Sequence, residues 1–599
     1  MEEDFLKKVM RFIFNKSNHK YIILLFIIGF LLRIIIASNL DPNADEMIYA
    51  PHAVNITSSG LLQEMNEDPL WFYLTDIGYK IFGVNLLTSR LLSIIFGALS
   101  IIIIYLLGKE MFNEKIGLIS SFLLTFSSFH ILITQAEMDV PMTFFIMLSL
   151  YFLVKFFKDA KSLNYILSII LLIIAILMKT IAAVFIPAYV IFIIYFNYKK
   201  DNKIFYIKNI KLGLIFLFIF FLLMLPTFTF NYLLYKDKGI VDVQFSRFTG
   251  VSKNEIYAGI SATMEPFRPE RVFFSYNGRV PGAWQAFLFY WKLDAILLIL
   301  FFLGLIVAYT LKNKWHILLT LLFIFPFIFL AGTSLLPPHF VYAIPIFALF
   351  GAFFIDKLPS ILKDQKNILV KVVMILFVIL SLFYVHSNHG LDKSPVNDLR
   401  NYVMNIKGDA LFIVDSRTYR GTNTFMFHDK DFIETSLLLE YSNKLPEADN
   451  IVVKIYIVEC LMDDCGWGTI KNQPDFNKTT ENFISYLTNN SNPLKTFYRG
   501  GKPYFKIYET TSQINPYVIV LGRESKNWFY YPVNYAPKDK ILFRYETKNN
   551  FDKSLNNLSF VILYLEILIA ILCIIAIFII FYIDYSKDDV NKKDREDIE

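Results

Sequence analysis

Residues 39–49 read Asn-Leu-Asp-Pro-Asn-Ala-Asp-Glu-Met-Ile-Tyr and follow directly on the first long apolar run of the chain, residues 21–38. That run is interrupted only by Arg33 and is long enough to cross a hydrocarbon core of about 30 Å as a helix. The stretch therefore places three carboxylates, Asp41, Asp45 and Glu46, at a membrane face. Carboxylates this close to lipid are costly unless solvated, paired or metal-bound, so the stretch is either an ordinary solvated helix end or a functional site.

The composition indicates a polytopic membrane protein. Of 599 residues, 55% are hydrophobic and 17% aromatic, and the mean hydropathy is +0.47. The net charge of +6 does not indicate nucleic-acid binding, because the basic residues are scattered through short loops and form no basic face. Three cysteines are too few for a disulfide scaffold or a zinc module. The first apolar run has no small-residue cleavage site, so we expect an uncleaved first span.

Apolar runs long enough to span a membrane recur along the chain, and we expect about twelve transmembrane helices. They lie at residues 21–38, 86–108, 116–134, 140–157, 163–179, 180–197, 210–230, 291–311, 315–331, 339–355, 368–385 and 558–583.

The distribution of lysine and arginine predicts the orientation. Alternate loops are rich in these residues, whereas loops of the opposite parity, such as 135–140 and 332–338, have none. The positive-inside rule makes the basic loops cytoplasmic and places the large segments on the outer face of the cell membrane. The predicted domains are a cytoplasmic N-terminus (1–20), a transmembrane catalytic domain (21–385, outer loops 39–85 and 231–290), an outer domain (386–557), a last helix (558–584) and a cytoplasmic tail (585–599).

The segment 386–557 differs in character from the rest. Strand-like runs occur at 410–414 and 451–458, and a hairpin pattern surrounds the glycine pair 500–501. Helical patterns lie between them, so we expect an α/β domain. Cys460 and Cys465 fall outside the membrane, where a small-loop disulfide is favoured over free thiols.

The predicted topology gathers polar residues from distant parts of the chain on the outer face. Asp45 and Glu46 share it with Glu137 and Asp139, which lie in a tight turn, and with Lys179 at the end of the fifth span. Two of these residues have an ordinary alternative role. Asp139 can cap a helix, and the Lys179 side chain can snorkel toward water. The loop 231–290 adds four arginines, which suit phosphate binding but can also be solvated or paired: Arg247, Arg268, Arg271 and Arg279.

The order of these features resembles the C-type (GT-C) polytopic membrane glycosyltransferases that use polyprenyl-phosphate sugars, such as protein O-mannosyltransferases and aminoarabinose transferases. The motif residues in this chain are Asp45-Glu46 with Tyr49, TSRLLSIIFGALS (88–100), QAEMDVPMTFF (135–145), LMKT (177–180), FSRFTG (245–250), PGAWQAFLFY (281–290) and PPHFVYAIP (337–345). The likeness covers roughly residues 20–385 and implies a GT-C transmembrane fold.

The chain departs from that family at two positions. The family usually carries a cation after the first loop and an arginine two residues before the second acidic position, where this chain has Asp68 and Glu137. Both exchanges add negative charge. A hard cation with oxygen ligands suits Asp68, Glu137 and Asp139, so a divalent ion such as Mg²⁺, Mn²⁺ or Zn²⁺ is a candidate cofactor.

The resemblance implies transfer of a monosaccharide, mannose-like or other, from a polyprenyl- or dolichyl-phosphate donor to a protein, lipid or glycan acceptor. The leaving group is already an anion, so one carboxylate suffices as general base, and single displacement inverts the anomeric centre. We expect Asp45 as the base, Glu46 positioning the acceptor or a metal, and Asp139 as a further catalytic acidic residue. Arg247, Lys179 and His339 are the candidate ligands of the donor phosphate.

Three other functions remain open. An oligosaccharyltransferase is related chemically, but the chain lacks the WWDYG signature. A transporter or flippase of lipid-linked saccharides should show internal repeats and mid-membrane charges, whereas here the charges gather at one face. A noncatalytic anchor for the outer domain would need only one or two spans.

Overall fold

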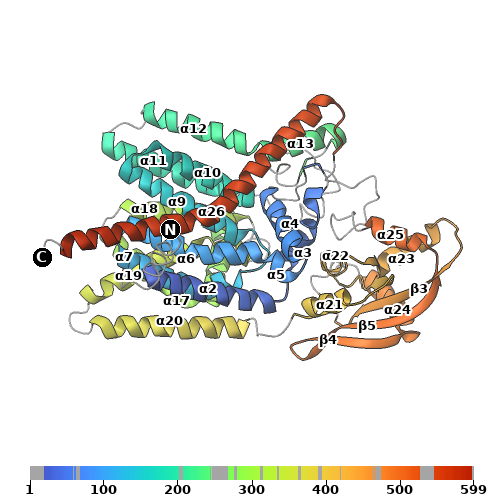
Figure 1. The fold of residues 1–599 in the computed structure, drawn as a ribbon. Helices are drawn as coiled ribbons and strands as arrows, with labels where there is room; N and C mark the ends of the chain where they lie inside the picture. Colours follow the sequence, from blue (N-terminus) through green and yellow to red (C-terminus); the bar gives the residue numbers. More distant parts are fainter. Residues whose placement is uncertain are drawn as a thin grey trace, which may run out of the picture.

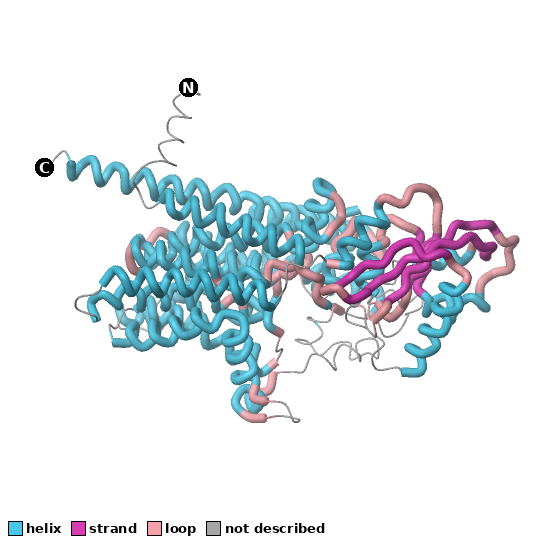
Figure 2. Tube along the Cα trace, turned by 90° about the horizontal axis from the view of Figure 1, so that it is seen from below, coloured by secondary structure: helices cyan, strands magenta, loops and turns pink. Residues whose placement is uncertain are grey.

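The computed structural model describes residues 19–58, 60–62, 68–201, 207–239, 241–242, 245, 267–275, 280–310, 314–333, 336–361, 366–388, 394–418, 420–462, 465, 474–525 and 545–596. It is a bundle of helices with a sheet domain at one end, and the short helices α3, α4 and α5 lie between the two (Figure 1). The view in Figure 2 shows the same division, with all named strands at that end.

Seven helices in the described part of the chain are long and apolar enough to cross a membrane. Six of them are α2 (His19–Asn39), α6 (Leu91–Met111), α9 (Asp139–Asp159), α17 (Gly282–Thr310), α18 (Lys314–Gly332) and α20 (Lys366–Asn388), and the seventh is the apolar part of α26 (Asn550–Glu596). Each coincides with one of the twelve predicted runs.

The other five predicted runs are helical but short or interrupted. They comprise α7 (Glu114–Phe126) with α8 (Ser128–Leu132), α10 (Ser162–Met178), η2 (Thr180–Phe185) with α11 (Ile186–Asp201), α12 (Ile207–Leu223) with α13 (Leu225–Lys238), and η4 (Pro337–Phe340) with α19 (Ala343–Ile361). The α12–α13 pair bends by 53° and counts as an eighth span if it is one broken helix. Within the described ranges, seven helices, or eight with that pair, are long and apolar enough to span a membrane, and the predicted number of about twelve spans stays a prediction.

Helices α6 and α9 form the centre of the bundle, and 83% of the most apolar window of each is buried. They are apolar on nearly every side, as expected for helices surrounded by other helices. Gly117 of α7 meets α6 closely: a Cβ atom there would lie 2.5 Å from the carbonyl oxygen of Tyr105, so this helix contact requires glycine.

The sheet domain has five strands in the order β2-β1-β3-β5-β4. Strand β1 pairs in parallel with β2 and β3, and β5 pairs antiparallel with β3 and β4. The strands are β1 (Leu411–Val414), β2 (Asp431–Glu434), β3 (Ile451–Cys460), β4 (Asn492–Arg499) and β5 (Lys502–Ile514). The helices are α21 (Pro395–Met404), α22 (Arg420–Met426), α23 (Thr435–Tyr441), α24 (Pro474–Asn489) and α25 (Tyr517–Ser525), with the turn η5 (Ser442–Lys444).

Three local predictions for this domain are confirmed. Strands β1 and β3 occupy the two predicted strand runs, and β4 and β5 form the hairpin that turns at Gly500 and Gly501. Cys460 and Cys465 form a disulfide.

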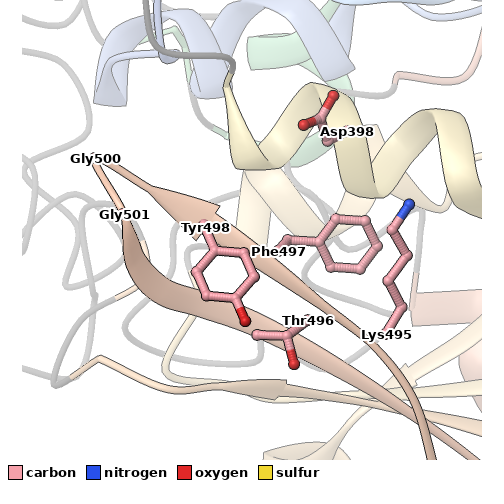
Figure 3. A pocket seen from close by; sticks show the side chains of 7 residues that line it. All are labelled: Asp398, Lys495, Thr496, Phe497, Tyr498, Gly500 and Gly501. Carbon is pink, nitrogen blue, oxygen red and sulfur yellow. The ribbon is translucent and has the colours of Figure 1, made fainter.

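The β4–β5 hairpin connects the sheet domain to the first loop. Arg499 Nε lies 2.7 Å from Asp41 Oδ2, a few residues before α3 (Ala44–His52). A pocket of about 300 Å³ lies between α21 and this hairpin, with Asp398 on one side and Lys495, Phe497 and Tyr498 on the other (Figure 3). The remaining short elements near this junction are η1 (Ile56–Ser58), α4 (Leu70–Phe82), α5 (Leu86–Ser89) and α16 (Pro269–Phe273).

Candidate active site

The start of α3 is fixed by a side-chain cap. The Asn43 side-chain oxygen accepts a hydrogen bond from the Glu46 backbone N–H at 2.7 Å, and this satisfies one of the otherwise unpaired N–H groups of the first turn. Asp45 and Glu46 lie in that turn, where the positive end of the helix dipole favours carboxylates. The cap therefore fixes the first turn of the helix that carries both carboxylates.

Glu46 has no exposed surface and is held by Arg90 at the start of α6. Arg90 Nε donates to Glu46 Oε1 at 2.6 Å and Nη2 donates to Oε2 at 2.7 Å, a bidentate pair. The backbone N–H of Ala136 also donates to Oε1, at 2.9 Å. The expected contact of Glu46 with acceptor or metal is corrected by this geometry, because both oxygens bind groups of the chain itself and the residue fixes α3 to α6.

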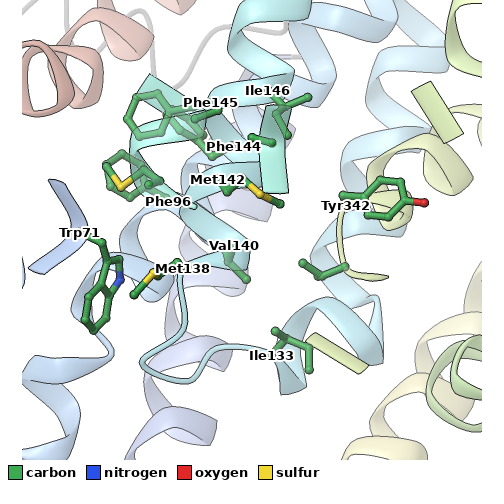
Figure 4. Close-up of a cluster of buried hydrophobic side chains, with 14 of the residues drawn as sticks. Trp71, Phe96, Ile133, Met138, Val140, Met142, Phe144, Phe145, Ile146 and Tyr342 are labelled. Atoms are coloured by element: carbon green, nitrogen blue, oxygen red, sulfur yellow. The ribbon is translucent and has the colours of Figure 1, made fainter. Parts of the chain in front are cut away.

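The turn that carries Glu137 and Asp139 packs against the same elements. Ser93 Oγ donates to the carbonyl oxygen of Glu137 at 2.9 Å, and Asn43 donates to the Glu137 carboxylate. Apolar side chains lie around the turn, with Trp71 and Met138 on one side and Val140 directly after it (Figure 4). Burial in this apolar shell strengthens the electrostatic interactions of the turn.

Asp139 is the first residue of α9, but its side chain does not cap that helix. Its Oδ2 atom lies 2.6 Å from Nζ of Lys179, the residue that follows α10. The two side chains are 0% and 5% exposed, so Lys179 does not snorkel toward water. Asp139 therefore does not act as a helix cap, and Lys179 does not act as a snorkelling side chain. The two residues instead form a buried ion pair between two distant parts of the chain.

Asp45 and Glu137 interact with this pair. Burial raises the pKa of Asp45 above its usual value, Lys179 lowers it, and the neighbouring Asp139 raises it. Burial, followed by Asp139 and Asp45, raises the pKa of Glu137 well above its usual value. Three carboxylates thus converge on one lysine, and the excess negative charge favours protonation of Glu137.

Asp45 differs from the other three carboxylates in its access to solvent. Glu46 and Asp139 are 0% exposed and Glu137 is 1% exposed, whereas Asp45 is partly exposed. A partly exposed carboxylate with a raised pKa is a stronger base than an ordinary carboxylate and can be reached by a bound hydroxyl.

The structure describes only some of the residues that were predicted to bind the donor phosphate. His339, in η4, lies in electrostatic range of Lys179 and Asp139. Arg247 and Arg279 lie outside the described residues. Arg271 Nη1 donates to the carbonyl oxygen of Thr333 at 3.0 Å, which connects α16 to the end of α18.

The predicted metal trio of Asp68, Glu137 and Asp139 is not assembled. Within the described ranges, no three His, Cys, Asp or Glu side chains are grouped so that they could hold a metal ion. Asp68 instead accepts hydrogen bonds from Thr227 Oγ1 at 2.6 Å and Thr180 Oγ1 at 3.1 Å. The expectation that these three residues form one divalent-cation site is therefore wrong.

Two supporting residues were not predicted. Asn43 caps α3, binds Glu137 and donates to Gln135 Oε1 at 2.9 Å; the spacing of Asn43 and Glu46 matches a capping box and could have indicated its role. Arg90 follows an apolar segment without another charge, and a buried arginine at such a position requires an acidic partner.

Comparisons with known proteins agree with this architecture. The family model described as dolichyl-phosphate-mannose-protein mannosyltransferase matches residues 66–227, which include Asp68, Glu137, Asp139 and Lys179. An uncharacterised protein of Aquifex aeolicus (strain VF5) is 28% identical over 370 residues, which are 58% of this chain and 68% of that protein.

Solved structures give the fold. The resemblance to the C-type membrane glycosyltransferases is confirmed. In particular, the chain has the fold of ArnT from Cupriavidus metallidurans in the apo state, with a TM-score of 0.52, 12% identity, and coverage of 82% of this chain and 98% of ArnT. The oligosaccharyltransferase AglB from Archaeoglobus fulgidus, in complex with an inhibitory peptide and a dolichol-phosphate, has a TM-score of 0.48 and 12% identity over 83% of this chain and 74% of AglB.

Proposed function

We propose that this chain is an inverting glycosyltransferase that moves a monosaccharide from a polyprenyl- or dolichyl-phosphate to a protein, lipid or glycan acceptor. The observation that carries the proposal is the convergence of Asp45, Glu137 and Asp139 on Lys179, from separate segments, in a chain with the ArnT fold. The family whose model matches residues 66–227 is named for a dolichyl-phosphate-linked sugar, which supports this class of donor.

Asp45 is the proposed base, because it combines partial exposure with a raised pKa. The acceptor hydroxyl attacks the anomeric carbon while its proton passes to an Asp45 carboxylate oxygen. The bond between the anomeric carbon and the phosphate oxygen breaks, and its electron pair leaves with the lipid phosphate. Attack opposite the leaving group inverts the anomeric configuration, as in other single displacements at this carbon.

Lys179 is the proposed group that stabilises charge on the departing phosphate. Its ammonium is held in place by Asp139 at 2.6 Å, so it is oriented before the donor arrives. His339, whose charge interacts with those of Lys179 and Asp139, is a further candidate ligand of the phosphate, and Arg247 remains a candidate by resemblance to the family. Glu46 and Arg90 serve as positioning residues for α3.

The reaction is proposed to take place on the outer face of the membrane. The basic loops predict that side, and the sheet domain lies at the same end of the bundle as α3 (Figure 1). The Arg499–Asp41 pair then connects the outer domain to the proposed site.

The proposal is tested by incubating purified protein with a panel of radiolabelled polyprenyl-phosphate monosaccharides and a membrane extract. We expect label from at least one donor to appear on an acceptor, with inverted anomeric configuration. Release of free sugar or movement of intact donor across a vesicle membrane, without transfer from any donor, would contradict the proposed activity.

A further inference from the structure

The carboxylate of Glu566 is buried in α26, the last helix that the structure describes. Glu566 is 0% exposed and lies in the apolar part of α26. Neither of its oxygens has a hydrogen-bond partner among the residues that the structure describes. An uncompensated charge in such a place is costly, so an ionisable residue inside a membrane span indicates a bound partner or a function.

The surroundings of Glu566 contain a second acidic residue. Helix α26 packs against α13, where Ser559 Oγ and Thr229 Oγ1 are 2.7 Å apart, and against α4, where the rings of Phe560 and Tyr73 are 6.3 Å apart. Asp68 lies just before α4, and its charge acts on Glu566. Two carboxylates from distant parts of the chain are therefore brought together in the protein interior.

The two carboxylates differ in their hydrogen bonds. Asp68 accepts from two hydroxyls, those of Thr227 and Thr180, as an ionised carboxylate does. Glu566, by contrast, receives no hydrogen bond from the residues that the structure describes. The charge of Glu566 is therefore not compensated by hydrogen bonds from that part of the chain.

We propose that Glu566 and Asp68 bind a hard cation, with the hydroxyl oxygens of Thr180 and Thr227 as further ligands. All four groups offer oxygen, the ligand type that Mg²⁺, Ca²⁺ and Mn²⁺ prefer. An ion with metal–oxygen distances of about 2.0–2.6 Å would compensate the charges of both carboxylates. This set uses two carboxylates and two hydroxyls, so it differs from the three-carboxylate trio predicted from the sequence.

The cation site is adjacent to the proposed active site but does not depend on the proposed function. Thr180 directly follows Lys179, whose ammonium pairs with Asp139. The ion fixes α26 to α4 and to the segment that carries Lys179, and it compensates the negative charge on that side. Ion binding can be measured whether or not the chain transfers sugar.

The test uses Mn²⁺ as the probe on full-length protein in detergent, after removal of metals with EDTA. Bound Mn²⁺ is counted from the loss of the free-ion electron paramagnetic resonance signal, and Ca²⁺ and Mg²⁺ are added as competitors. We expect saturable binding that weakens by at least about tenfold in both Glu566→Gln and Asp68→Asn, because each removes a charged ligand. Mn²⁺ should also raise the thermal unfolding midpoint of the parent protein but not that of Glu566→Gln.

Two variants serve as controls. Asp139→Asn should keep this binding, which separates the site from the acidic cluster around Asp45. Glu110→Gln removes a carboxylate that pairs with Lys158 and should also keep the binding. In EDTA, Glu566→Gln should be at least as stable as the parent protein, since it removes an uncompensated charge. Mn²⁺ binding that is absent in the parent protein, or equal in the parent, Glu566→Gln and Asp68→Asn, would overturn the proposal.

Discussion

The ammonium of Lys179 lies 2.6 Å from Oδ2 of Asp139, and both side chains are buried. The pair joins the end of α10 to the start of α9, and its two charges act in opposite directions on Asp45. The pKa of the proposed base, Asp45, therefore depends on both neighbours, so a substitution of either neighbour should change it.

The first prediction concerns the pH dependence of turnover. The acid limb of kcat/KM reports the pKa of the free enzyme's base. Asp139→Asn removes the charge that raises the pKa of Asp45 and leaves Lys179, so the limb should move to lower pH. Lys179→Met removes the charge that lowers this pKa, so the limb should move to higher pH. Lys80→Met, whose lysine pairs with Asp76, is the control and should leave the limb in place.

The pH profile of each variant is obtained from initial rates at a series of pH values. Shifts of the two variants in the same direction, or no shift in either, would show that Asp45 is not the group that titrates.

The second prediction concerns the positioning pair. Arg90→Ala leaves Glu46 buried without its partner and should destabilise the protein by about 3–5 kcal/mol, as breaking buried pairs does. The double variant Glu46→Gln/Arg90→Met removes both charges and should recover part of that loss. Thermal unfolding in detergent provides the measurement. If Glu46→Gln instead unfolds like the parent protein while turnover is abolished, Glu46 acts in the chemistry and not in positioning.

The third prediction concerns the orientation in the membrane. A cysteine at Ser485, on α24 of the sheet domain, should react with an impermeant thiol reagent added to intact cells, and one at Ser162, after a basic loop, should not. Both positions are exposed, and the native cysteines do not interfere because two form a disulfide and Cys573 is buried. The reverse labelling pattern would place the proposed active site in the cytoplasm.

The sequence predicted which segments are helical, but it did not predict where these helices are interrupted. Each apolar run is helical, but hydropathy does not register a break such as the one at Ser127 between α7 and α8, or the bend between α12 and α13. Such breaks depend on local hydrogen bonds and packing rather than on average apolarity. The strands of the sheet domain were predictable because their β-branched and aromatic runs are bounded by turn residues.

The candidate site, too, could be predicted from the sequence only in part. Asp45, Asp139 and Lys179 could be brought to one membrane face by topology alone. The partner of Glu46 could not be predicted from local pattern, because Arg90 lies on another helix and the bidentate geometry arises only in the folded chain. The metal trio failed for a related reason: a shared face does not imply convergence, and Asp68 binds Thr180 and Thr227 instead.

The central claim is that Asp45 removes the proton of the acceptor, and the most direct measurement compares Asp45→Asn with the parent protein in donor binding and in transfer rate. The amide keeps the shape of the side chain and loses the proton acceptor, so we predict a loss of transfer of about 10²–10⁴-fold with donor affinity and thermal unfolding nearly unchanged. Transfer by a folded Asp45→Asn variant at the rate of the parent protein would contradict the account.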